Sequence, residues 1–263
     1  MNVTKDPWSP AQYGKFERER EQPFYDLLAM VQPRPGMRIV DLGCGTGKQT
    51  RELHARLRAH ETTGVDRSAR MLETASKIEP APGLQFRRGD IESFPDGAAN
   101  YDVIFSNAAL HWVEDHETLF ERLASALAPH GQLAAQMPAM HDETAHLLAA
   151  ELITIEPYRS ASGGYRKPQP VLAPDAYARL MFRLGFDVPA VRVIVYPHVL
   201  PGPEDVVEWV KGTLLAEYSR HLPPDMFERF LDDYRRRLLE RIGSERPFLF
   251  AFKRILLWGE RSA

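Results

Sequence analysis

Arg38-Ile-Val-Asp-Leu-Gly-Cys-Gly-Thr-Gly47 is the stretch of sequence that decides the fold of this 263-residue chain. A short apolar run with one acidic residue leads into glycines at three alternate positions, 43, 45 and 47. Glycines directly after a strand let the backbone approach a bound cofactor, because a Cβ atom would block that approach. The stretch therefore predicts a strand, a glycine loop at its carboxyl end and a ligand site beside the loop.

Two shorter motifs follow at the ends of the next apolar segments. Gly64-Val-Asp66 places an aspartate about 25 residues after Asp41, and Gly89-Asp-Ile91 comes next. An aspartate at the tip of the second strand of such a unit is placed to accept hydrogen bonds from ribose hydroxyls. In this order and at these spacings, the three motifs predict an enzyme that binds a nucleoside cofactor.

The glycine loop also indicates which nucleoside cofactor is bound. A dinucleotide site has the pattern G-x-G-x-x-G with the pyrophosphate on the helix N-terminus, whereas this loop is Gly43-x-Gly45-x-Gly47. Asp41 would face a diphosphate unfavourably but suits a cofactor that carries an ammonium and a sulfonium. Since the phosphate-binding pattern G-x-x-x-x-G-K-[ST] is also absent from the sequence, ATP is disfavoured.

Val40-Asp-Leu-Gly-Cys-Gly-Thr-Gly47 resembles the first motif of the class I S-adenosylmethionine-dependent methyltransferases. The resemblance implies that S-adenosyl-L-methionine is the cofactor, and that Asp90 meets its adenine amino group beside Ile91. For Asp90 a turn or helix cap is the alternative, and for Met71 packing on adenine competes with a role in helix core. Cys44 is interpreted as a small residue that fills the turn rather than as a nucleophile. The cofactor site is expected to contain Asp41, Gly43, Cys44, Gly45, Asp66, Arg67, Met71, Asp90, Ile91 and Asn107.

Strand and helix patterns alternate along the first half of the chain. Strands are expected at 38–42, 62–65, 84–87, 101–106 and 132–137, with helices at 48–57, 69–77 and 119–127. The fold class is therefore α/β, a Rossmann-like, doubly wound and mainly parallel sheet of seven strands, with ligands beyond the carboxyl ends of the strands. The last two strands are expected at 191–197 and 248–258, the latter antiparallel and on the far side of the sheet.

We expect one methyltransferase domain over residues 1–263, in several parts. These are an N-terminal helical lid (1–32), the cofactor-binding core (36–138), a helical cap (139–188 and 203–245) that includes a polar connection at 160–168, and two final strands (190–198 and 247–259). Tyr13, Phe16 and Arg20 share one face of the helix expected from Trp8 to Val31, so they are assigned to a lid over the cofactor. Docking of that helix on ordinary core is the alternative.

Ser106-Asn-Ala-Ala-Leu-His-Trp112 follows the fourth strand, where the methyl group and its acceptor should meet. The segment lacks the Asn-Pro-Pro-Tyr or Asp-Pro-Pro-Tyr pattern that serves transfer to amide or exocyclic nitrogens. His111 and Trp112 are the catalytic candidates. His111 titrates near neutrality and could act as a general base, donate to an anionic substrate or hold Trp112.

Several longer segments resemble the trans-aconitate 2-methyltransferases. They are Trp8-Ser-Pro-Ala-Gln-Tyr13 with Phe16, Glu19, Arg20 and Pro23, then 106–116, Leu133-Ala-Ala-Gln136-Met-Pro138, Trp209-Val-Lys-Gly-Thr213 and Phe252-Lys-Arg-Ile-Leu-Leu-Trp258. One departure is Leu214-Leu-Ala-Glu217, where members of the family tend to continue Gly-Leu-Arg-Pro. If that arginine holds a substrate carboxylate, this chain accepts a different acid.

The resemblance implies methyl-ester formation on a small polycarboxylic acid, trans-aconitate or similar. Such an acid is ionised at neutral pH and needs no protein base. The candidates for holding it are Gln136, Tyr165, Arg166, Tyr218, Lys253 and Arg254, with Lys167 and His198 also considered. The alternatives are a methyltransferase that acts on another metabolite or on an acyl-carrier-bound carboxyl group, and a non-enzymatic protein that binds S-adenosylmethionine.

Composition narrows the possible partners. A net charge of −3 and a pI near 6.3 give no basic surface for nucleic acid. No apolar run approaches the ~20 residues that span a bilayer, and the first residues show no secretory signal. With a single cysteine, a reducing cytoplasm is expected. We expect a monomer or weak homodimer, a small-molecule carboxylate substrate and no metal site.

Overall fold

The computed structural model describes residues 17–95 and 100–262, with side chains from Glu21 onward. The chain divides into two compact units, which are described separately. Unit 1 comprises residues 1–138, 170–194 and 254–263, and unit 2 comprises residues 139–169 and 195–253. Unit 2 is thus built from two insertions into the chain of unit 1.

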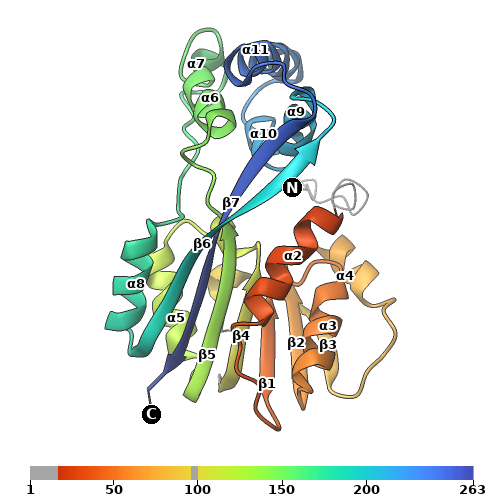
Figure 1. Ribbon diagram of the computed structural model, residues 1–263, viewed down its shortest axis with the longest axis vertical. Helices are drawn as coiled ribbons and strands as arrows, with labels where there is room; N and C mark the ends of the chain where they lie inside the picture. The colour runs from red at the N-terminus through yellow and green to blue at the C-terminus, as the bar shows by residue number, and fades with distance from the viewer. Residues whose placement is uncertain (1–16, 96–99, 263) are drawn as a thin grey trace. The chain divides into compact units, whose positions relative to one another are not determined.

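A seven-stranded sheet in the order β3-β2-β1-β4-β5-β7-β6 organises the chain (Figure 1). Its strands are β1 (Arg38–Leu42), β2 (Glu61–Asp66), β3 (Leu84–Arg88), β4 (Tyr101–Asn107), β5 (Leu127–Pro138), β6 (Phe186–Leu200) and β7 (Phe248–Arg261). The pairs among β1 to β5 are parallel, and β7 pairs with β5 in the antiparallel sense. The predicted Rossmann-like α/β fold with a mainly parallel sheet is confirmed.

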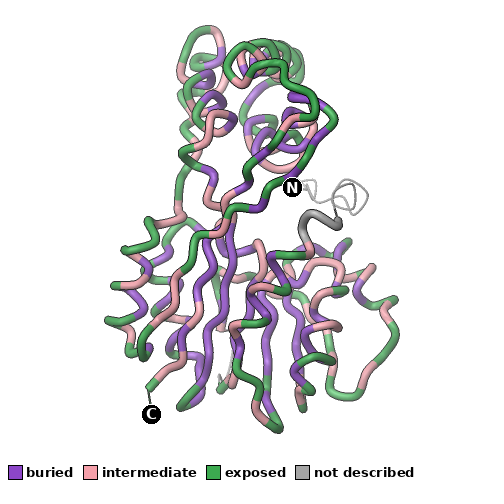
Figure 2. Tube along the Cα trace, in the orientation of Figure 1, coloured by how far each residue is buried: buried purple, intermediate pink, exposed green. Residues whose placement is uncertain are grey.

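The central strands are largely buried because both faces of the sheet are covered. In β1 every residue after Arg38 is buried, and Val103 to Ser106 of β4 are buried as well (Figure 2). The helices of unit 1 are α2 (Glu17–Leu28), α3 (Lys48–Leu57), α4 (Ala69–Ala75), α5 (His116–Ser125) and α8 (Pro174–Arg183), with single 3₁₀ turns η1 (Ile91–Ser93) and η2 (Leu110–Trp112). Because the strand order reverses between β1 and β4, a crevice forms where their carboxyl ends diverge.

Helix α5 and its neighbours differ from the sequence prediction. The helix begins at His116 rather than at Leu119, because Asp115 caps it by accepting a hydrogen bond from the Thr118 amide at 3.0 Å. It ends before Leu127, which is already paired with Tyr101 in the sheet. Strand β7 agrees with the prediction, since it is antiparallel to β5 and lies on the far side of the sheet, between β5 and β6.

The described part of α2 is anchored in the core of unit 1. Phe24, Leu27 and Leu28 are buried in one cluster with residues of β1 and β4, and the ring of Phe24 meets Phe105 edge-on at 5.7 Å. This half of the helix therefore docks on ordinary core, which was the alternative interpretation. Tyr13 and Phe16 lie outside the described residues, as does the side chain of Arg20.

Unit 2 contains helices packed around a small aromatic core. They are α6 (Thr144–Leu152), α7 (Tyr158–Ala161), α9 (Glu204–Lys211), α10 (Leu214–Tyr218) and α11 (Pro224–Ile242). Helix α11 packs against α6, α7 and α9 through Phe230, Tyr234 and Leu238, which are fully buried. Helix α7 lies partly within the predicted polar connection, and α8, predicted as part of the cap, belongs to unit 1. Among the helices described, none combines the length and apolar character needed to cross a bilayer.

Candidate cofactor and active site

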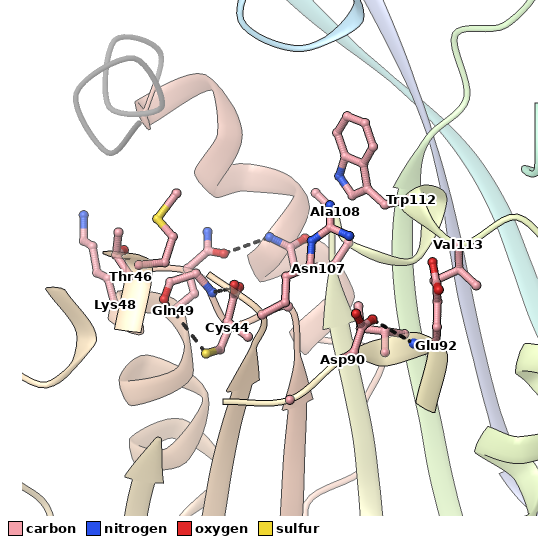
Figure 3. Close-up of a pocket in the computed structure, with 18 of the residues that line it drawn as sticks. Cys44, Thr46, Lys48, Gln49, Asp90, Glu92, Asn107, Ala108, Trp112 and Val113 are labelled. Atoms are coloured by element: carbon pink, nitrogen blue, oxygen red, sulfur yellow. Dashed lines mark hydrogen bonds between the residues drawn. The ribbon is translucent and has the colours of Figure 1, made fainter. Parts of the chain in front are cut away.

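A cavity of about 300 Å³ opens at the carboxyl ends of β1, β2 and β4, within unit 1 (Figure 3). Its size is typical of a small-molecule site, and its place is the switch point of the sheet. Nine of the predicted cofactor residues line it: Gly43, Cys44, Gly45, Asp66, Arg67, Met71, Asp90, Ile91 and Asn107. Three motifs far apart in sequence thus meet around one cavity.

The glycine loop forms the wall of the cavity that follows β1. Gly43 has φ +78°, and a Cβ there would lie 2.2 Å from Cβ of Ala109, so only glycine fits. Gly45 has φ +54°, and the space where its Cβ would project is open. The loop therefore exposes bare backbone to the cavity, as a closely held ligand requires.

Asp66 is held firmly at the tip of β2. Its Oδ2 accepts a hydrogen bond from the Gly45 amide at 2.8 Å, and its Oδ1 accepts one from the Ser68 amide at 2.8 Å. The two bonds orient the carboxylate, and each oxygen keeps capacity to accept another bond. This geometry suits recognition of a ribose diol.

Asp90 and Met71 lie where both of the roles weighed from sequence are possible. Asp90 caps η1 through a bond from the Glu92 amide at 3.1 Å, and it also lines the cavity. Met71 is buried in the α4 packing, and it too contributes to the cavity lining. The alternatives are therefore compatible rather than exclusive.

The charge of the cavity is predominantly negative. Among the described residues that line it, the charged side chains are Glu21, Asp66, Asp90 and Glu92 against Lys48 and Arg67. The charge of Lys48 is offset by Glu21, whose Oε1 lies 2.9 Å from Lys48 Nζ. Such a field favours a ligand with cationic groups and disfavours a diphosphate.

Asp41 does not line the cavity, contrary to the prediction. Its side chain is buried beneath the loop and accepts a hydrogen bond from Thr50 Oγ1 at 2.6 Å. Burial raises the pKa of Asp41 to about 7, aided by the charge of Asp66 and opposed by the Thr50 bond. Burial, together with the nearby carboxylates of Asp41 and Asp66, raises the pKa of the Cys44 thiol, so the thiol stays neutral at pH 7. The structure therefore favours Cys44 as a turn-filling residue.

A row of polar side chains runs from the cavity into the sheet. Asn107 Nδ2 donates to Gln49 Oε1 at 2.8 Å (Figure 3), and Gln136 Nε2 donates to Asn107 Oδ1 at 2.6 Å. Arg254 Nη1 donates to Gln136 Oε1 at 2.9 Å. Gln136 and Arg254 were predicted to hold substrate, but both are buried in this row of hydrogen bonds and neither lines the cavity.

The two catalytic candidates are placed differently. Trp112 lines the cavity, whereas His111 does not and packs its ring on Trp112 at 4.7 Å. Of the three roles considered for His111, this contact supports the one in which the His111 ring holds Trp112 in place. The neighbouring His116 is structural, since it bonds to Tyr177 of α8 and to the Leu110 carbonyl.

The other substrate candidates lie in unit 2, where local contacts occupy several of them. Lys253 Nζ contacts Asp142 at 2.7 Å and Glu143 at 2.8 Å, so two carboxylates already neutralise it. Tyr165 donates to Glu217 at 3.3 Å and meets the ring of Tyr218 at 6.1 Å. Exposed Arg166 borders a second cavity of about 150 Å³ together with Tyr165 and Arg159. Lys167 donates to the carbonyl of Pro168, and His198 stacks on Trp209.

Sequence reasoning missed other residues of the cavity lining. Lys48 and Gln49 open α3 directly after the glycine loop, so their position could have predicted them. Glu21 is different, because only the docking of α2 on the sheet brings it to the cavity. The remaining residues missed are Thr46, Gly89, Glu92, Ala108, Ala109 and Val113.

Comparison with known proteins gives consistent matches. A family model described as a methyltransferase domain matches residues 39–131. The chain is 41% identical over 261 residues to a trans-aconitate 2-methyltransferase of Deinococcus radiodurans, covering 97% of this chain and 98% of that one. It is 35% identical over 259 residues to a trans-aconitate 2-methyltransferase of Variovorax paradoxus, covering 97% and 99%.

Solved structures share the fold at lower identity. The YcgJ protein of Bacillus subtilis has a TM-score of 0.61 at 16% identity, covering 92% of this chain and 99% of that chain. Phosphoethanolamine N-methyltransferase 2 of Haemonchus contortus, in complex with S-adenosyl-L-methionine, has a TM-score of 0.57 at 15% identity, covering 92% and 53%.

Proposed function

Because the chain belongs to the trans-aconitate 2-methyltransferase family, we propose that it methylates one carboxylate oxygen of trans-aconitate or of a closely similar small polycarboxylic acid. The protein is an S-adenosylmethionine-dependent methyltransferase. The substrate is a free small molecule, and the net charge of −3 offers no basic surface for a nucleic acid.

The cavity of unit 1 fits the cofactor. Asp66 would bind the ribose hydroxyls, Asp90 and Ile91 would meet the adenine, and Met71 would pack against its ring. Bare backbone at Gly43 and Gly45 allows close approach, and the predominance of carboxylates favours a cation. When bound, the cofactor supplies an electrophilic methyl group on a positively charged sulfur.

The observation that carries the acceptor class is the similarity to trans-aconitate 2-methyltransferases over 97% of the chain. Among the described residues that line the cavity there is no histidine and the Cys44 thiol is neutral, so the carboxylates of the lining are the groups left that could take up a proton. A hydroxyl or amine acceptor would need help with its proton, whereas a carboxylate with a pKa of about 4 is already ionised. The chain then has to orient the acceptor oxygen, with Trp112 as one wall, and exclude water.

The test is turnover with a panel of di- and tricarboxylic acids, with mass spectrometry and NMR of the product. We expect trans-aconitate or a near analogue to gain one methyl group as an ester, with S-adenosylhomocysteine formed in equal amount. A methyl group found on nitrogen or on a neutral hydroxyl would overturn the proposal.

A further inference from the structure

Four side chains of unit 1 form a continuous line of hydrogen bonds that ends at the cavity. Arg254 lies on β7, Gln136 on β5, Asn107 at the end of β4 and Gln49 in the first turn of α3. The sheet sets their spacing, because Asn107 and Gln136 are register partners in the parallel pair β4–β5. The three donor–acceptor distances are 2.9, 2.6 and 2.8 Å in that order. We refer to these four side chains as the amide relay.

The direction of the amide relay follows from the chemistry of its buried end. A guanidinium has only donors, so the group of Gln136 that faces Arg254 has to be the carbonyl oxygen. The amide nitrogen of Gln136 then points to Asn107 and has to donate, which turns the Asn107 oxygen toward it. Asn107 in turn donates to Gln49, whose own amide nitrogen is left for the cavity.

Among the described residues that line the cavity, the side-chain amides are Gln49 and Asn107 and the cations are Lys48 and Arg67. The carboxylates of Glu21, Asp66, Asp90 and Glu92 line it, and Lys48 is paired with Glu21. An anionic group of a ligand would be repelled by these carboxylates and needs N–H donors directed at it. The amide relay supplies such donors at Gln49 and at Asn107, both of which line the cavity.

We propose that Arg254 and Gln136 are positioning residues that fix the amides of Asn107 and Gln49 with their N–H groups toward the cavity, where they bind a carboxylate. This inference rests on the proposed function, because the carboxylate belongs either to the methionine moiety of the cofactor or to the acceptor acid. It replaces the predicted direct contact of Gln136 and Arg254 with substrate.

An isosteric substitution can reverse the amide relay. In Gln136→Glu one oxygen still accepts from Arg254, but the other can no longer donate to Asn107. The Asn107 amide then rotates so that its nitrogen donates to the new carboxylate, and its oxygen turns toward Gln49. Gln49 has to rotate in turn to donate to that oxygen, which leaves the Gln49 amide oxygen, in place of its nitrogen, facing the cavity. The matched control is Gln132→Glu on the same strand, also fully buried, whose oxygen accepts from the Gln32 amide and from Trp258 outside the amide relay.

Calorimetric titration of the full-length variants separates the two sources of the carboxylate. If the cofactor supplies it, Gln136→Glu should weaken S-adenosylhomocysteine binding about tenfold or more, while binding of 5′-methylthioadenosine, which lacks the amino acid moiety and its carboxylate, stays unchanged. If the acceptor supplies it, both nucleosides bind as before and the KM for the acid rises by about the same factor. In both cases Gln132→Glu leaves affinity and KM unchanged.

A second pair of variants tests the donor-only requirement. Arg254→Lys keeps a group that can only donate and should preserve ligand affinity, whereas Arg254→Gln removes the constraint and should weaken it. The proposal is overturned if folded Gln136→Glu has the wild-type Kd for S-adenosylhomocysteine and the wild-type KM for the acid. It is also overturned if this variant loses as much affinity for 5′-methylthioadenosine as for S-adenosylhomocysteine, or if Arg254→Lys and Arg254→Gln have the same ligand affinity. Failure of the wild type to bind either nucleoside would instead refute the proposed function.

Discussion

Replacement of Asp66 by alanine tests the cofactor site most directly. The carboxylate is oriented by the Gly45 and Ser68 amides, at 2.8 Å each, which leaves it poised to accept from two ribose hydroxyls. Hydrogen bonds to a charged group contribute about 1.5–3 kcal/mol, so Asp66→Ala should weaken S-adenosylhomocysteine binding about 10- to 150-fold. Titration calorimetry measures this change.

The loss of affinity has to be separated from damage to the loop. Without Asp66 the two amides lose their acceptor, so thermal unfolding of the ligand-free variant should show a loss of about 1–3 kcal/mol. Ser68→Ala is the control. It removes the cap on the Met71 amide but not the backbone bond to Asp66, so it should lower stability and spare affinity.

A chemical variant of the ligand completes the test. Adenosine should bind the wild type more tightly than 2′,3′-dideoxyadenosine does, and this difference should vanish in Asp66→Ala, because the hydroxyls then have no carboxylate to bind. Unchanged affinity of the variant for S-adenosylhomocysteine, or an undiminished preference for adenosine, would refute the assignment of Asp66 to the ribose.

Three further predictions concern stability, the N-terminal helix and acid–base catalysis. Burial raises the pKa of Asp41 from 3.8 to about 7, so the folded state binds more protons than the unfolded state between these values and stability falls as pH rises through them. Asp41→Asn should abolish that fall, worth up to about 4 kcal/mol, in chemical denaturation between pH 4 and 8; parallel curves for variant and wild type would contradict the raised pKa. Deletion of residues 1–21 should abolish turnover while circular dichroism shows a folded sheet, since the anchors Phe24 and Leu27 remain, and full activity would refute a lid. His111→Gln should keep a substantial kcat, and the kcat of the wild type should show no transition near pH 6–7. A large loss of kcat in the variant would support His111 as a general base.

The alternation of strands and helices could be predicted because its signals are local. Buried parallel strands read as short apolar runs, and glycines or acidic residues mark where they end. The ends of helices were less well predicted where a single capping side chain decides at which residue the helix begins. Asp115 starts α5 one turn earlier than the apolar pattern suggested, by capping it.

The residues of the cavity were predictable where they follow strands. Asp66 ends β2, while Gly43 and Asp90 follow β1 and β3, and parallel strands bring their carboxyl ends to one edge of the sheet. Glu21 was not predictable in this way, because its place depends on how Phe24 and Leu27 seat α2 on the sheet.

By itself, the sequence determined the α/β fold, the class of cofactor and the edge of the sheet where the site lies, since these follow from local patterns. The tertiary structure alone decided the partners of charged and polar side chains. Asp41 points into the core, Lys253 is neutralised by Asp142 across 111 residues of sequence, and Arg254 meets Gln136 across 118. Electrostatic and hydrogen-bond pairing depends on distances of a few ångströms, which residue type and spacing along the chain do not specify.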